Sequence, residues 1–182
     1  MTFSSTTTEP QTSLFREANI QKRFMTPDQI VREIYKAIQS KLPPPLVAKL
    51  TFKDPDNLKK QGSNICRGRI LPLRMKTVFD TDWCFFEVGI GRYAAGGACG
   101  VGFVCFPENK KCGKGIHSAT ISDLISRYAA THQGFVDSRR GEPAQCVFLY
   151  YPAIPKIEQL ATALSTLIAN TFPYLEQLTV SK

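Results

Sequence analysis

Hydrophobic residues first recur at helical spacing in this chain, then alternate with polar residues, and later return to the helical period. Thr26 and Gln29 form a capping-box pair at the start of the first apolar-periodic stretch, which ends at the three prolines 43–45. The same periodicity predicts a second helix over 118–131. Periodicity also predicts a third helix that starts at Pro155, and Pro173 should end it, so its predicted range is 155–172.

Between these helices the pattern is typical of strands, since apolar and polar residues alternate or form short apolar runs. In the stretch 84–90 the even-numbered residues are apolar and share one face. The polar segment 54–64 is interpreted as a connection. Strands are predicted over 46–53, over 65–79 in two pieces divided by Pro72, over 84–90, over 101–106 and over 146–151.

This order of elements predicts an α+β protein of two layers. We expect a mainly antiparallel sheet of about five strands with two to three helices packed on one face. Residues 1–20 are rich in Thr and Ser without any period, so they are predicted to be a disordered polar tail. Residues 21–182 are then predicted to form a single domain, which is long enough to bury its own core.

Composition narrows the expected environment. The chain has no apolar run of about 18 residues, and its first residues lack the basic and apolar regions of a secretory signal. We therefore expect no membrane association and a cytoplasmic location. The six cysteines are expected to be free thiols, because disulfides are rare inside the cell.

The formal charge of +8 favours acidic or phosphate-rich partners. Within 67–76 the alternation places Arg67 with Arg69, and Arg74 with Lys76, on common strand faces. Cations two residues apart on a strand lie about 6–7 Å from each other, close to the spacing of phosphates along a nucleic-acid strand. This segment is a candidate phosphate-binding surface.

Three further cations, Lys110, Lys111 and Lys114, would extend that surface if the fold brings their loop close. The preferred hypothesis is a nucleic-acid-binding domain acting through these seven residues, as a subunit of a nucleoprotein assembly with other protein subunits. It assigns no catalytic residue, no metal and no cofactor. Two alternatives stay open: a solvated sheet face that discourages edge pairing, and a basic face for an acidic protein partner.

The loop around Lys110, Gly113 and Gly115 lies between a predicted buried strand and a predicted helix. It resembles the pyrophosphate loop of the general N-acetyltransferase superfamily, where an Arg or Gln precedes two spaced glycines and backbone amides bind acetyl-CoA. Helix N-termini suit phosphate groups for that reason. The resemblance implies an acyl-CoA-dependent N-acyltransferase as an alternative function, with Lys110 at the Arg/Gln position.

The spacing of Cys99, Cys105, Cys112 and His117 is similar to that of CCCH zinc fingers, which bind RNA. Three thiolates and one imidazole would satisfy zinc chemically. That resemblance implies a zinc site inside the nucleic-acid-binding hypothesis, although 101–106 has the character of a core strand.

The carboxylates of Asp80, Asp82 and Glu87 allow one more alternative, a metal-dependent nuclease. Nucleases of the restriction-enzyme type usually place a lysine two residues after the glutamate. Gly89 stands there in this chain, and a hairpin turn would account for the two aspartates without a metal.

Overall fold

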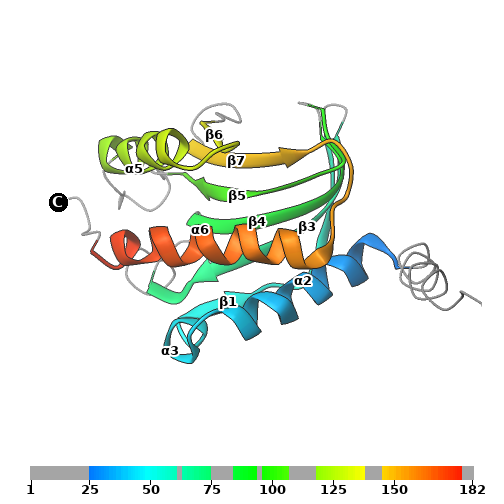
Figure 1. The fold of residues 1–182 in the computed structure, drawn as a ribbon, viewed down its shortest axis with the longest axis horizontal. Coiled ribbons are helices and arrows are strands. Elements are labelled where there is room, and N and C mark those ends of the chain that lie inside the picture. The colour runs from blue at the N-terminus through cyan, green and yellow to red at the C-terminus, as the bar shows by residue number, and fades with distance from the viewer. Residues whose placement is uncertain are drawn as a thin grey trace, which may run out of the picture.

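The computed structural model describes residues 25–60, 63–74, 84–93, 96–106, 118–137 and 145–177, and they form two layers (Figure 1). The helices of the described part are α2 (Pro27–Lys41), α3 (Pro44–Val47), α5 (Ser118–Thr131) and α6 (Ile157–Gln177). The strands are β1 (Leu50–Phe52), β2 (Asp56–Lys60), β3 (Ser63–Pro72), β4 (Cys84–Arg92), β5 (Cys99–Cys105), β6 (Val136–Asp137) and β7 (Gln145–Tyr151). The predicted α+β class is confirmed, with seven strands in these residues rather than about five.

The described strands form one antiparallel sheet in the order β1-β3-β4-β5-β7-β6, with β2 also paired to β3. Strand β3 is long enough to hold β1 and β2 one after the other on its outer side, through Ile70–Pro72 and Ser63–Arg67. Its inner side pairs with β4. The strand β3 therefore joins a short two-part edge to the centre of the sheet.

All three long helices cover the same face of the sheet. Helices α2 and α6 lie side by side across it (Figure 1), and Ile121 and Ile125 of α5 belong to the same buried cluster as Val147 of β7. Residues at even positions of β3 and β4 and at odd positions of β5 face these helices. This side, the helix-covered face, contains the main core, and the other side is called the far face below.

Helix α2 begins as its sequence predicts. The backbone amide of Gln29 donates to Oγ1 of Thr26 over 3.3 Å, and the Thr26 amide donates to Oε1 of Gln29 over 2.8 Å. These reciprocal bonds satisfy two amide groups that a helix start leaves without an intrahelical partner. They fix the orientation of the helix that packs on β3.

The stretch predicted as a strand over 46–53 is instead divided. Pro44 and Pro45 occupy the first turn of the short helix α3, where a missing amide hydrogen costs nothing, and extended structure starts only at Leu50. The prediction of a connection over 54–64 is also wrong, because β2 occupies 56–60 and β3 already begins at Ser63. Strands β2 and β6 lie at the edges of the sheet, where polar residues are tolerated and the apolar pattern is weak.

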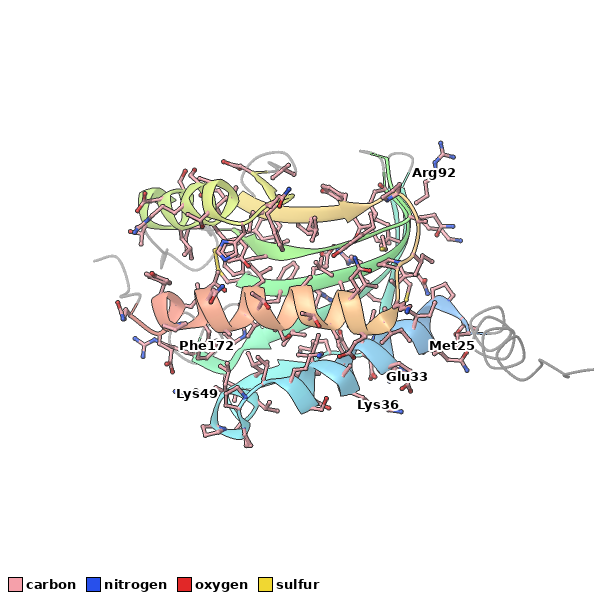
Figure 2. The ribbon with its side chains drawn as sticks, viewed as in Figure 1. Met25, Glu33, Lys36, Lys49, Arg92 and Phe172 are labelled. Carbon is pink, nitrogen blue, oxygen red and sulfur yellow. A yellow bond between two sulfur atoms is a disulfide. The ribbon has the colours of Figure 1, made fainter. Side chains whose placement is uncertain are left out.

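The prediction that Pro173 ends the last helix is wrong as well, because α6 continues through it to Gln177. Phe172 and Leu175 are almost fully buried, so extending the helix gains apolar burial that offsets the hydrogen bond lost at the proline. Figure 2 shows Lys49 beside the ring of Phe172, with Nζ 5.9 Å from the ring centroid. The end of α6 is thus joined to the segment before β1.

The expectation of free thiols is corrected at one pair of cysteines. Cys84 and Cys105 occupy directly paired positions at the ends of β4 and β5, and a disulfide joins them in the core. Cys66 and Cys99 are free and buried, which agrees with the expectation for these two. Cys146 is buried as well.

Two other expectations concern the N-terminal tail and membrane association. The predicted tail over 1–20 lies outside the described residues. Among the helices that the structure describes, none combines the length and apolar character needed to cross a bilayer.

Replacing Gly68 with alanine should destabilise the fold by about 1–3 kcal/mol. A Cβ at this position would collide with Val31 and with the hydroxyl end of Tyr35, so α2 would have to move away from β3. Urea unfolding measures the change. Gly100→Ala is the matched control, since the nearest atom to its added Cβ would belong to the ring of Tyr150, at 3.1 Å. Equal losses in the two variants would contradict the close approach of α2.

Reducing the disulfide between Cys84 and Cys105 should lower the free energy of unfolding by about 3 kcal/mol, because the bond closes a loop with a sequence separation of 21 residues. Urea midpoints with and without a reductant give the loss. The variant with Cys84→Ala and Cys105→Ala should show no response to the reductant. Alkylation of both cysteines in the unreduced, unfolded wild-type chain would show that the bond does not form.

Candidate nucleic-acid interface

Arg67 and Arg69 lie together on the far face of the sheet. They alternate along β3 with Cys66 and Ile70, which belong to the core beneath the helices. The prediction that these two arginines share a face is therefore confirmed. The neighbouring edge strand β2 places Asp56 directly opposite Arg67.

One carboxylate bridges the two guanidinium groups. Arg67 donates from Nε to Oδ1 of Asp56 over 2.9 Å and from Nη2 to Oδ2 over 3.1 Å, and Arg69 donates from Nη2 to Oδ2 over 3.1 Å. The side chains are 21% exposed for Arg67, 33% for Arg69 and 37% for Asp56, so solvent reaches all three. We call the two guanidinium groups of Arg67 and Arg69 the arginine fork.

Neighbouring rings hold the arginine fork in place. The guanidinium carbon of Arg69 lies 5.6 Å from the centroid of the Phe85 ring on β4, a distance suited to a cation–π interaction. On the helix-covered face, the hydroxyl of Tyr35 donates to the carbonyl oxygen of Arg69 over 3.2 Å. Burial raises the pKa of Tyr35, so this hydroxyl keeps its proton and remains a donor at neutral pH.

The electrostatic surroundings are less basic than the sequence suggests. Glu87 lies on β4 in register with Arg69 and is 1% exposed, so acidic residues stand on the strands at both sides of the arginine pair. The surroundings of the two arginines on the far face are therefore of mixed charge rather than wholly cationic.

The one other predicted cation among the described residues does not belong to this arrangement. Arg74 is half-buried and lies after the end of β3, so it does not share the strand face of Arg67 and Arg69. The remaining predicted contact residues lie outside the described part of the chain: Lys76, Lys110, Lys111 and Lys114. The structure thus brings together two of the seven predicted residues, and the nucleic-acid-binding role of all seven stays a prediction.

Sequence reasoning missed Asp56, because the polar segment 54–64 was interpreted as a connection. A signal was present: Gly62 is typical of a hairpin turn, and a hairpin there would align the preceding residues with the arginine-containing strand. The pairing of Asp56 with Arg67 follows once that hairpin is recognised.

Elsewhere on the far face, aromatic rings pack over glycines of the adjacent strand. A Cβ on Gly102 would lie 2.7 Å from the ring of Phe148, and one on Gly100 would lie 3.1 Å from that of Tyr150. Phe148 is completely buried. This ring therefore contributes to sheet packing and is not presented for stacking on bases.

The zinc arrangement implied by the CCCH resemblance is ruled out as one site. Cys99 and Cys105 stand at opposite ends of β5, about 20 Å apart at the usual rise of a strand, whereas ligands of one zinc lie within a few ångströms of each other. Cys105 is also consumed by the disulfide. Cys112 and His117 lie outside the described residues.

The two enzymatic alternatives rest largely on residues that the structure does not describe. The Lys110–Gly115 loop lies outside the described residues, although α5 begins at Ser118 as predicted. Asp80 and Asp82 are outside them too, and no group of three or more metal-ligating side chains occurs within the described part. Both alternatives stay predictions.

No protein-family model matches this chain, and no curated protein or solved structure matches it either. The fold defines the chain as a two-layer α+β protein with its helices on one face of an antiparallel sheet. Its function is therefore argued from the arginine fork itself.

The thiol of Cys99 should resist modification in the native state. Burial raises its pKa to about 11, so the reactive thiolate is scarce at neutral pH. Because the unfolded thiol ionises near pH 9 and the folded one near 11, its contribution to stability is complete below about pH 9 and is lost as the pH rises toward 11. Urea midpoints between pH 8 and 10 should fall less in Cys99→Ala than in the wild type. Identical pH profiles would contradict this.

Proposed function

We propose that this protein binds single-stranded nucleic acid through its phosphates, with Arg67 and Arg69 as contacts on the far face. The observation that carries the proposal is that the two guanidinium groups already hold one oxyanion, the Asp56 carboxylate, through three hydrogen bonds. Guanidinium forks bind phosphate oxygens with the same bidentate geometry. The arginine fork is therefore a preformed oxyanion-binding arrangement.

Two further properties support this function. The chain carries a formal charge of +8, which attracts polyanions over a distance that shortens as the ionic strength rises. The two guanidinium groups also converge on the same carboxylate oxygen, Oδ2 of Asp56, so both can contact one phosphate of a strand. A flexible single strand can adjust to such a pair.

The same contacts also have a structural role, because Asp56 belongs to the edge strand β2 and the arginines to β3. An ion pair across two strands stabilises the edge by roughly 0.2–1 kcal/mol at this exposure. An experiment on function must therefore separate loss of binding from loss of the edge strand.

Replacing Arg67 and Arg69 with glutamine should weaken binding of a fluorescein-labelled, mixed-sequence 20-nucleotide DNA strand about tenfold. Loss of the phosphate that the two arginines share should also lower the slope of log affinity against log salt by about 0.7. Glutamine is used because glutamate would add two carboxylates beside Asp56. Fluorescence anisotropy between about 50 and 200 mM salt measures both quantities.

The matched control carries glutamine at Lys36 and Arg127, which changes the net charge equally. Both side chains are well exposed, at 72% and 66%, and they belong to α2 and α5 on the helical layer; Figure 2 labels Lys36 on α2. It should bind within about twofold of the wild type. Equal losses of affinity in the two double variants would mean that diffuse charge attraction, and not the arginine fork, explains the binding. A wild-type chain that binds no oligonucleotide would refute the proposal.

A further inference from the structure

The carboxylate of Asp56 occupies the place where a phosphate would contact the arginines. Both of its oxygens accept hydrogen bonds, Oδ1 from Arg67 and Oδ2 from both arginines. A phosphodiester also presents two non-bridging oxygens, so it would require the same donors. The two anions cannot hold the fork at the same time without placing like charges in contact.

Asp56 differs in this respect from its neighbour Asp54. Asp54 is 88% exposed and pairs with Arg32 of α2 rather than with the fork. Asp56 is 37% exposed and pairs with both fork arginines. The two aspartates are two residues apart and carry the same charge, but only Asp56 blocks the guanidinium groups.

We infer that Asp56 is an intramolecular competitor for the ligand of the arginine fork, so that a nucleic-acid phosphate binds by displacing it. This inference rests on the proposed function and adds a regulatory element to the same site. In the free protein the carboxylate satisfies the two cations. On binding, a phosphate replaces it and the carboxylate turns to solvent, which its partial exposure allows.

Displacement has a consequence for selectivity. An isolated carboxylate or monovalent anion from solution offers no more charge than Asp56, which is already held at high local concentration by the strand pairing. Several phosphates in one strand engage the protein together and so compensate for the lost ion pair. The competitor therefore selects polyanions over single small anions.

Asp56→Asn should tighten binding of the single-stranded 20-mer by about two- to fivefold, since one exposed charge pair no longer opposes the ligand. The salt slope should become steeper by about 0.7, because a phosphate now meets arginines without their counter-charge. Asp54→Asn raises the net charge by the same amount outside the fork and should leave the slope unchanged. Fluorescence anisotropy across a salt series measures both variants.

A wild-type measurement keeps the inference testable if Asp56→Asn weakens the edge strand. Addition of the 20-mer to the ¹³C,¹⁵N-labelled wild-type chain should move the Asp56 carboxyl carbon resonance toward that of a solvated aspartate. The Asp54 resonance should stay in place, and circular dichroism and melting temperature report whether the variants are folded.

The outcomes separate the two proposals. If the glutamine variant of Arg67 and Arg69 loses binding but Asp56→Asn gains none and the Asp56 carboxyl resonance does not move, the competition is wrong and the proposed function stands. Equal gains from Asp54→Asn and Asp56→Asn would also overturn the competition, because total charge would explain both. A wild-type chain without affinity for the oligonucleotide overturns both proposals.

Discussion

The alternation of side chains along β3 is the constraint on which both the core and the candidate site depend. One set of residues, including Gly68 and Ile70, packs beneath the helices, and the intervening set places Arg67 and Arg69 on the far face. A shift of one residue in the pairing of β3 would move the arginines into the core and the apolar residues out of it. Because such a shift is so unfavourable, packing of the core also fixes the position of the guanidinium groups.

Much of this architecture could be predicted from the sequence, where local signals and burial agree. The capping box at Thr26 and the alternating apolar face of 84–90 depend on neighbours in the chain, and both occur as expected. The predicted end of the last helix at Pro173 failed because a local rule was outweighed by tertiary burial of Phe172 and Leu175. The short strands β2 and β6 were missed because polar edge strands lack a strong apolar pattern.

The candidate site shows the same division between local and long-range information. That Arg67 and Arg69 share a face follows from strand periodicity alone. That Asp56 lies between them depends on the register of a strand pair, and the separation of Cys99 from Cys105 depends on β5 being one continuous strand. Charge and spacing along a sequence therefore identified the cations but not their counter-charge, which reduces the net charge of the surface they form.

The aromatic rings that lie over glycines on the far face restrict how this sheet can vary. Phe148 fills the space above Gly102, whose missing side chain is what makes room for the ring. A side chain at 102 would meet not only this ring but also the carbonyl oxygen of Val147 at 2.4 Å, so a smaller residue at 148 would not by itself make room for it. Glycine is therefore expected to persist at position 102 during evolution even where the residue at 148 varies in size.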